Sequence, residues 1–327
     1  MKLINIFDAP IYSFETIDST NKYAKDLCKD KIKNGTIVVS EHQTNGRGRL
    51  GNSWESPKNS GIYYSIIFEK LNDNLKYETL TLFLCLGITK LFENYSIISQ
   101  IKWPNDILIN GKKVCGILSE CNSTSAGNFI VIGIGINVYQ NENDFPEELK
   151  TKATSLKLHT SSTIIKNYLI NNLTSTIYDF YNKFLSNGFD DFKDEYKTKS
   201  FLMNKEICVK VNGNDTYGKV IDFDNLGKLI LKCENEILSI NSGEVSLRNI
   251  YKWKRATLKV ALLNLTFVSN LHWFSQFLFR LWLFYIFTYY IQSFYFTFIK
   301  FYFTHVVILF KIFELNNSWI HHVVYVT

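Results

Sequence analysis

The order of apolar and polar positions predicts a chain that begins as a mixture of strands and helices. Short apolar or alternating runs are typical of strands, whereas apolar residues spaced by three and four indicate helices. Strands are predicted at residues 11–17, 36–40, 61–68, 101–109, 113–120 and 128–139. Helices are predicted at residues 22–29, 77–94, 163–187 and 193–199. This order favours an α+β fold built on a mixed β-sheet.

From Glu206 onward the pattern changes to strands alone. Polar turns with glycine or asparagine separate the short apolar stretches, which lie at residues 207–211, 217–223, 229–231, 237–240 and 243–247. Several short strands in a small span are typical of a small β-barrel. We therefore expect a second, separate module after the α+β domain.

Two turn signals lie close together in the middle of the first domain. Pro104 interrupts one apolar run, and Asn110-Gly111 is a strong signal for a β-hairpin. The hairpin is expected to bring four polar side chains together: Lys102, Asn105, Asp106 and Lys113.

A glycine- and arginine-rich stretch, residues 41–54, follows the apolar run 36–40. It holds three glycines and two arginines within six residues. Glycine lets the backbone approach a ligand closely, and arginine supplies planar charged groups that suit phosphate and carboxylate oxygens. The stretch is therefore a candidate loop for an anionic ligand. For an isolated Gly-Arg-Gly-Arg, an exposed polar turn would be the commoner interpretation.

Ser19, Thr20 and Asn21 stand where a strand pattern gives way to a helix pattern. Each is an ordinary helix N-cap residue. Three in succession exceed what one cap requires, and the spare hydroxyls and amide suit a neutral polar ligand such as a ureido group, which offers donors and an acceptor.

Gly133 and Gly135 lie two apart in the apolar run 128–139 and so share one strand face. A strand face without side chains often admits a ligand. A dinucleotide-binding interpretation is rejected, because Asn137-Val138-Tyr139 continues the strand where that fingerprint needs a helix. The chain also holds no Walker A motif.

The net charge of +6 is unevenly distributed. Residues 251–327 hold seven Lys/Arg and one acidic residue, which leaves 29 basic and 29 acidic residues in 1–250. The first 250 residues are thus charge-neutral, and no DNA partner is expected for them. The six cysteines form no Cys-x-x-Cys pair and sit in apolar runs. We expect buried free thiols, no metal site, and a cytoplasmic location without a signal peptide.

Residues 251–327 differ in composition from the rest, with many aromatics and no Gly, Pro or Asp. Residues 281–299 carry no charge and are long enough to cross a bilayer. A membrane segment is one interpretation; translation beyond the natural end of the gene is the other.

Five motifs occur in order along residues 10–249. They are Asp18-Ser19-Thr20-Asn21, Gln43 with Gly46-Arg47-Gly48-Arg49 and Trp54, Lys102-Trp103-Pro104-Asn105-Asp106, Lys113 with Gly116-Ile117-Leu118-Ser119-Glu120, and Gly133-Ile134-Gly135-Ile136-Asn137. Together they resemble the biotin protein ligase family, and the small C-terminal module, which ends with residues 242–248, resembles its SH3-like domain. The resemblance implies a class II synthetase-like catalytic domain at 1–200, an SH3-like β-barrel at 203–249 and a tail at 251–327. No DNA-binding domain is expected before residue 1, so the repressor function of some members is not expected either.

The resemblance implies ligation of biotin to a lysine of a biotin carboxyl carrier protein, such as an acetyl-CoA carboxylase subunit. Biotin and ATP are the substrates, Mg²⁺ is expected, and biotinyl-AMP is the intermediate. No enzyme nucleophile is required, so catalysis would rest on positioning and on stabilising phosphate charge. A homodimer is a further expectation. The alternatives are a lipoate or octanoate ligase, or a membrane-tethered biotin-binding protein.

Roles carried over from the family fall on three overlapping sets of residues. The biotin set is Ser19, Thr20, Asn21, Gln43, Arg47, Gly48, Arg49 and Lys113. The ATP set is Arg49, Trp54, Lys102, Asn105, Lys113 and Asn137. The catalytic set is Arg49, Lys113, Asp106 and Lys102, with no resident metal ligands. The glycine-rich stretch is expected to be a mobile lid that closes over biotinyl-AMP.

Overall fold

The computed structural model describes residues 2–71, 75–211, 214–241 and 243–247. These belong to one compact unit, residues 1–248, and the second unit, 249–327, lies outside the described residues. The predicted membrane segment at 281–299 falls in that second unit. Among the described helices, none has the length and apolar character needed to cross a membrane.

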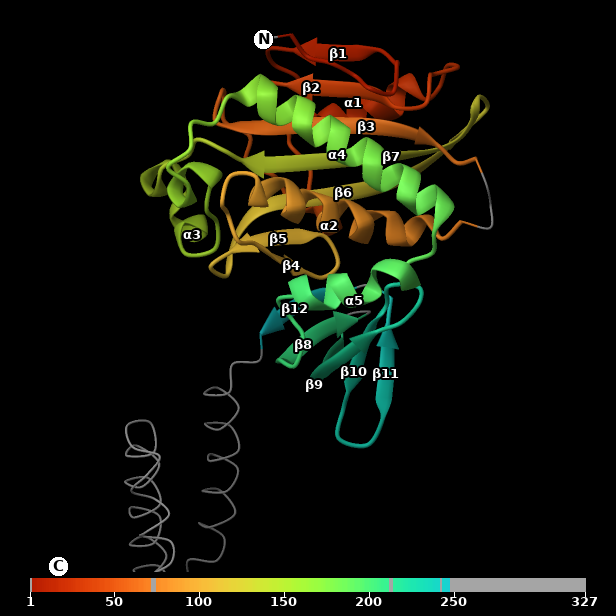
Figure 1. Ribbon diagram of the computed structural model, residues 1–327, viewed down its shortest axis with the longest axis vertical. Coiled ribbons are helices and arrows are strands. Elements are labelled where there is room, and N and C mark those ends of the chain that lie inside the picture. Colours follow the sequence, from red (N-terminus) through yellow and green to blue (C-terminus); the bar gives the residue numbers. More distant parts are fainter. Residues whose placement is uncertain (1, 72–74, 212–213, 242, 248–327) are drawn as a thin grey trace, which may run out of the picture. The chain divides into compact units, whose positions relative to one another are not determined.

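A seven-stranded mixed sheet forms the centre of the first domain (Figure 1), in the order β1-β2-β3-β7-β6-β5-β4. Only β1 and β2 are parallel. The strands are β1 (Ile11–Phe14), β2 (Thr36–Ser40), β3 (Gly61–Glu69), β4 (Gln100–Lys102), β5 (Asp106–Ile109), β6 (Lys112–Thr124) and β7 (Gly127–Asn137). The expected α+β class and mixed sheet are confirmed.

Helices cover both faces of this sheet, and two of them, α2 and α4, cross the same face (Figure 1). That face holds the large core, because alternate residues of β3 such as Ile62, Tyr64 and Ile66 point into it. The opposite face packs on α1 through a smaller core that includes Ala24 and Val131. The α-helices are α1 (Thr20–Leu27), α2 (Leu80–Glu93), α3 (Glu147–Lys150), α4 (Lys166–Ser186) and α5 (Asp190–Lys199).

The smaller core beneath α1 covers only part of its face of the sheet. Register pairing aligns Ser65 of β3 with Gly133 of β7, and Gly133 with Leu118 of β6. One step along, Gly135 pairs with Gly116. Since paired residues share a face, this region combines short side chains and bare backbone beside the α1 N-terminus.

The last described strands form a five-stranded antiparallel sheet in the order β11-β10-β9-β8-β12, consistent with a small SH3-like domain. They are β8 (Glu206–Val211), β9 (Asn214–Phe223), β10 (Leu229–Lys232), β11 (Ile237–Ile240) and β12 (Glu244–Leu247). Among the described residues no strand pairing joins β11 to β12, so closure of this sheet into the predicted β-barrel is not shown. The buried Trp103 indole donates to Gly227 O at 2.9 Å and ties this sheet to the first domain.

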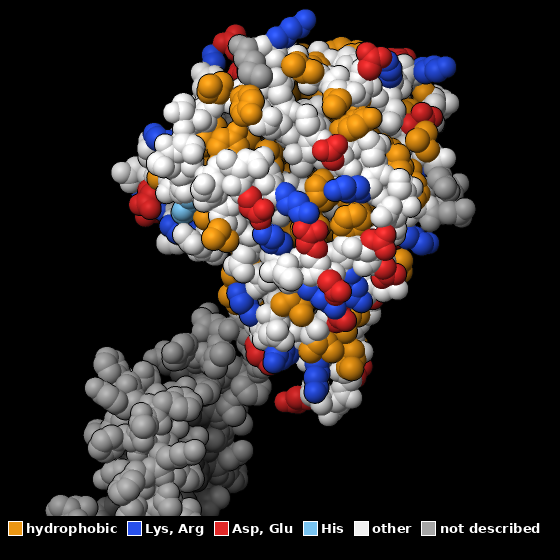
Figure 2. Space-filling view, in the orientation of Figure 1, with side chains coloured by type: hydrophobic (Ala, Val, Ile, Leu, Met, Phe, Trp, Pro, Cys, Tyr) orange, Lys and Arg blue, Asp and Glu red, His pale blue; other side chains and the backbone are white. Residues whose placement is uncertain are grey.

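Several predicted details needed correction. The first strand ends at Phe14 rather than at residue 17, and the helix predicted from residue 77 begins with a 3-10 turn, Tyr77–Thr79. All six cysteines are free, but Cys121 is exposed, so the prediction that every thiol is buried is wrong. Acidic and basic side chains are interspersed on the face drawn in Figure 2, without a large patch of one sign. That distribution matches the neutral charge balance of residues 1–250.

Candidate active site

A cavity of about 190 Å³ opens on the glycine-bearing face of β6 and β7. It gathers nearly all the side chains that the sequence motifs single out. Lining residues from the predicted sets are Ser19, Thr20, Asn21, Gln43, Arg47, Gly48, Arg49, Trp54, Lys102, Asn105, Asp106 and Lys113. The exception is Asn137, which is absent from this lining; its buried amide donates to Thr154 O at 3.0 Å.

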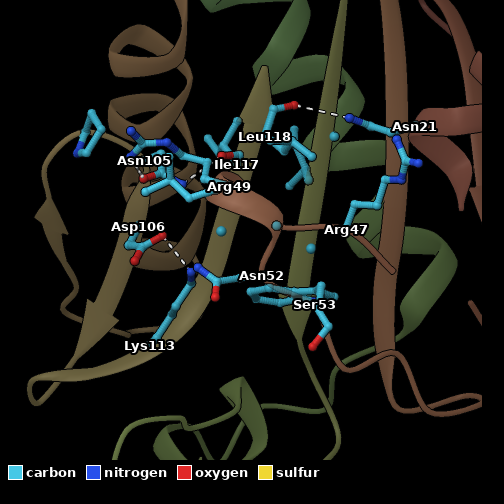
Figure 3. Close-up of a pocket in the computed structure, with 18 of the residues that line it drawn as sticks. Asn21, Arg47, Arg49, Asn52, Ser53, Asn105, Asp106, Lys113, Ile117 and Leu118 are labelled. Atoms are coloured by element: carbon cyan, nitrogen blue, oxygen red, sulfur yellow. Dashed lines mark hydrogen bonds and ion pairs between the residues drawn. The ribbon is translucent and has the colours of Figure 1, made fainter. Parts of the chain in front are cut away.

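Uncharged hydrogen-bonding groups make one end of the cavity. Ser19 caps α1, and its hydroxyl accepts only a long hydrogen bond, 3.4 Å, from Lys22 N. Gln43 Oε1 accepts from Thr20 N at 2.9 Å and lies 3.1 Å from the Thr20 hydroxyl. The Gln43 amide is oriented from behind because its Nε2 donates to Ser56 Oγ at 2.9 Å. This end therefore presents neutral groups in fixed positions. Arg47 of the glycine- and arginine-rich stretch also lines the cavity and lies beside Asn21 at this end (Figure 3).

The Asn21 side chain lies against Gly133. A Cβ at position 133 would stand 2.2 Å from Asn21 Oδ1, so only glycine leaves room for this amide. Asn21 Nδ2 donates to Glu120 Oε2 at 3.0 Å and, more weakly, to Leu118 O at 3.4 Å (Figure 3). The glycine-bearing strand face therefore contacts the Asn21 side chain and also lines the cavity.

The glycine- and arginine-rich stretch is a short hairpin over the cavity. Arg47 pairs with Ser53 in an antiparallel bridge, Gly48 N donates to Asn52 O at 2.7 Å, and a 3-10 turn spans Arg49–Gly51. Leu50 at the tip is 74% exposed and has a φ of 56°, a left-handed conformation that is unfavourable for leucine. The predicted mobility of this loop stays a prediction.

Trp54 leaves the same loop and lies on the second bare patch of the sheet. A Cβ at Gly135 would be 2.4 Å from the indole, and one at Gly116 would be 2.9 Å from it. Lys113 Nζ lies 5.2 Å from the centre of the ring, within cation–π range. The paired glycines therefore make a seat for an aromatic ring next to a lysine.

The opposite end of the cavity is cationic. Lys113 Nζ forms an ion pair with Asp106 Oδ1 at 2.7 Å, and Figure 3 shows the two side chains pointing toward each other. Lys102 of β4 lies opposite Asp106 of β5 in the antiparallel strand register, and it lines the same wall. Arg49 reaches this end from the loop and donates from Nη1 to Asn105 Oδ1 at 2.8 Å. The hairpin prediction for these four residues is confirmed by their common place in the lining.

Asn105 is held by the strand next to it. Its Nδ2 donates to Ile117 O, and Ile117 N donates to Asn105 O, both at 2.9 Å. With its amide fixed in this way, Asn105 Oδ1 becomes a rigid acceptor for Arg49. Asn105 thus joins the loop to the β4–β5 turn, a role that the sequence did not suggest.

Two further residues near the cavity were given no role by the sequence analysis, which named Glu120 only as part of a motif. Ser65 is fully buried in β3, and its Oγ lies 2.8 Å from Thr20 Oγ1 and 2.6 Å from Asn21 Oδ1. Glu120 of β6 binds Asn21 and Lys25. The available signal was a lone serine inside an otherwise apolar run, and a glutamate on the same strand face as Gly116.

Burial alone would raise the pKa of Glu120, but hydrogen bonds from Asn21 and Lys25 outweigh burial and hold the pKa below its ordinary value. Burial raises the pKa of Tyr63, another lining residue, to about 12. At neutral pH Glu120 is therefore charged and Tyr63 is neutral.

Comparison with known proteins gives matches over both domains. Residues 13–137 match the biotin/lipoate A/B protein ligase family, and residues 202–248 match the biotin protein ligase C-terminal domain. The bifunctional ligase/repressor BirA of Bacillus subtilis is 34% identical over 235 residues, which cover 71% of this chain and 72% of that protein. The biotin–[acetyl-CoA-carboxylase] ligase of Mycobacterium tuberculosis is 28% identical, covering 64% and 78%.

A solved structure agrees with these matches. The biotin protein ligase of Aquifex aeolicus in complex with biotin and ATP superposes with a TM-score of 0.64 at 30% identity, covering 73% of this chain and 98% of that one. Sequence and fold therefore agree, and the chain belongs to the biotin protein ligase family.

Proposed function

We propose that this chain is an ATP-dependent ligase that joins biotin to a lysine of a biotin carboxyl carrier protein through biotinyl-AMP. The observation that carries the proposal is the polarity of a single cavity. Thr20 and Gln43 supply neutral hydrogen-bonding groups at one end, beside Asn21 and Arg47, and Lys102, Lys113 and Arg49 supply positive charge at the other. Biotin is polar and uncharged at its ureido ring and anionic at its carboxylate, so its two ends match the two ends of the cavity.

In the first step a biotin carboxylate oxygen attacks the α-phosphorus of ATP, and pyrophosphate leaves. Two anions must meet for this bond to form. Lys113 stands between the neutral end and the other cations of the wall, so its ammonium can contact the carboxylate and the α-phosphate together. Charge so placed lowers the repulsion and stabilises the transition state. Arg49, fixed by Asn105, contributes a second positive group for the phosphate oxygens.

In the second step the amine of the carrier lysine attacks the carbonyl carbon of biotinyl-AMP, and AMP leaves. An amide bond forms as the acyl–phosphate bond breaks. The attacking amine must lose a proton, and Asp106 is the acidic residue among the described residues that line the cavity. Once substrate phosphates compete for Lys113, Asp106 becomes free to attract the carrier's ammonium and to take its proton.

Mg²⁺ also fits the donor set of this wall. Mg²⁺ is usually bound by one or two carboxylates together with substrate phosphates, and Asp106 supplies one carboxylate. When bound, the ion would neutralise phosphate charge. Among the described residues no cluster of three or more His, Cys, Asp or Glu side chains surrounds a metal position. Trp54, beside Lys113, offers its ring to the adenine of the nucleotide.

Several further expectations belong to the same proposal. Residues 1–200 form the catalytic domain and residues 203–249 the SH3-like domain, which the family match at 202–248 supports. The enzyme works in the cytoplasm, which the six free cysteines support. The loop over the cavity shields biotinyl-AMP from water, and Asn137, whose amide donates to Thr154 O, contributes to nucleotide binding. The homodimer stays a prediction.

Biotin-dependent exchange of labelled pyrophosphate into ATP tests the proposal. We expect exchange with biotin, and its loss in Lys113→Ala. The matched control is Lys112→Ala, the neighbouring lysine of β6, which donates to Lys150 O instead of lining the cavity. Exchange with octanoate or lipoate but not with biotin would replace this proposal with a lipoate-type ligase.

A further inference from the structure

Behind the neutral end of the cavity lies a buried chain of hydrogen bonds that starts at Glu120. The carboxylate is linked to Lys25 by an ion pair of 2.9 Å. Its other oxygen accepts from Asn21 Nδ2 at 3.0 Å. A charged carboxylate can only accept hydrogen bonds, and so can the carbonyl of Leu118 on the same side of Asn21. The nitrogen of the Asn21 amide must therefore face Glu120, and its oxygen must face the other way.

That orientation fixes the proton of Ser65. Asn21 Oδ1 lies 2.6 Å from Ser65 Oγ and cannot donate, so the Ser65 hydroxyl donates its single proton to Asn21 Oδ1. Toward its other neighbour, Thr20 Oγ1 at 2.8 Å, Ser65 then presents only lone pairs. All three side chains are at most 4% exposed, so water is a poor substitute for any of these partners.

Thr20 is consequently surrounded by acceptors within the protein. Ser65 Oγ lies on one side, and Gln43 Oε1, fixed as an acceptor by Thr20 N, lies on the other at 3.1 Å. Because Ser65 has no proton left for the 2.8 Å contact, the Thr20 proton must lie in it, and the hydroxyl keeps its lone pairs for the cavity that it lines. Thr20 is thereby set to accept a hydrogen bond from a ligand.

We propose that Glu120 and Ser65 are specificity-determining positioning residues that act through Asn21 to make Thr20 an acceptor for a ring N–H. This inference rests on the proposed function and extends it. Neither residue needs to touch the ligand. A ring that presents N–H to the Thr20 hydroxyl forms a hydrogen bond. A ring with oxygen at that position brings its lone pairs against those of Thr20 Oγ1. Sites built in this way discriminate strongly, because a mismatched polar group is left buried and unpaired.

The proposal predicts a change in selectivity, which a general loss of packing would not produce. The ligands are biotin and the two cyclic carbamate analogues in which one or the other ring N–H is replaced by oxygen. Calorimetric titration of the full chain should show that the unaltered protein rejects one carbamate by roughly tenfold or more relative to biotin. In Ser65→Ala the Thr20 hydroxyl loses the acceptor that fixes its proton and can turn that proton toward the cavity, so this ratio should fall at least about fivefold.

Ser99→Ala is the matched control, because Ser99 is also buried, at 3% exposure, and its hydroxyl has no hydrogen-bond partner in the described part of the chain. It should leave the ratio unchanged. A second pair of variants tests the same proposal if Ser65→Ala does not fold. Glu120→Leu frees the Asn21 amide to rotate and should lower the ratio of the affinity for biotin to that for the rejected carbamate. Glu120→Gln can still accept from Asn21 and should leave that ratio unchanged.

The outcomes separate the inference from the function on which it rests. Equal weakening of biotin and both carbamates in Ser65→Ala, or equal ratios in Glu120→Leu and Glu120→Gln, would overturn the role of this chain while leaving the ligase proposal intact. Failure of the unaltered protein to bind biotin at all would overturn both.

Discussion

Arg49 and Asn105, 56 positions apart in the sequence, are joined by a hydrogen bond of 2.8 Å from Nη1 to Oδ1. Arg49 belongs to the loop over the cavity, and Asn105 to the turn between β4 and β5. Both residues line the cavity with Lys113. The bond therefore joins the loop over the cavity to the turn between β4 and β5.

Arg49→Ala should release biotinyl-AMP faster, because the loop loses both its contact with Asn105 and its charge on the phosphate. We expect at least roughly a tenfold faster leakage, the scale of a lost charge-assisted hydrogen bond. Asn105→Ala should cause a smaller increase in the same direction. Rapid-quench measurement of free biotinyl-AMP checks both, and simple additivity in the double variant would contradict the proposed linkage.

Lys113→Ala should reduce the rate of adenylation by roughly 10²–10³-fold, the cost of removing one preorganised group at developing charge. The lost contacts are the ion pair with Asp106 and the position beside Trp54. Single-turnover formation of biotinyl-AMP measures this step alone. If Lys112→Ala lowered the rate as much, the effect would have to be assigned to strand β6 as a whole.

Gly135→Ala should displace Trp54 from its seat, since the added Cβ would lie 2.4 Å from the indole. We expect the KM for ATP to rise by roughly tenfold, with a loss of stability of about 1–3 kcal/mol from overpacking. Gly188→Ala is the control, because no atom lies within 4 Å of the added Cβ. An unchanged KM for ATP in a folded Gly135→Ala protein would remove Trp54 from the nucleotide site.

Glu120 should make the folded state sensitive to acid. Its pKa is lower in the folded protein than in the unfolded chain, so its stabilising contribution is present above the unfolded pKa and is lost as pH falls through the folded pKa. Urea unfolding at pH 7 should find Glu120→Gln less stable by roughly 0.5–1 kcal/mol, since the Lys25 pair is partly exposed. The difference should shrink toward pH 3. A constant difference across this range would assign the effect to something other than ionisation.

Deleting residues 251–327 should leave both half-reactions intact. Every residue assigned to the cavity lies between Ser19 and Val245, within the first compact unit. Exchange and carrier-labelling assays on a 1–250 fragment measure the effect. Loss of exchange in a folded fragment would give the tail a part in the reaction.

Local sequence patterns predicted the strands because those patterns report burial and backbone conformation directly, whereas the roles of the site residues came from the family resemblance. The strand at 36–40 and the bare face at Gly133 and Gly135 are both of this kind. What fills that face, Asn21 and Trp54, could not be predicted, since it depends on which side chains tertiary packing brings across the sheet. Asn137 was expected at the nucleotide, but the loop ending at Thr154 binds its amide.

The role of Ser65 could not be predicted from local sequence patterns either. One serine in an apolar strand reads as a tolerated small core residue, and only its contacts with Thr20 and Asn21 give it a role. Whether β11 and β12 come close enough to close the small sheet depends likewise on tertiary packing, which no local pattern encodes.

A crystal structure with biotinyl-AMP bound tests the central claim most directly. We predict the ureido ring beside Thr20 and Gln43, with a ring N–H about 2.7–3.2 Å from Thr20 Oγ1. The phosphate should lie within hydrogen-bonding distance of Lys113 Nζ and the Arg49 guanidinium. A ligand bound in the opposite direction, or with its phosphate remote from Lys113 and Arg49, would contradict the account.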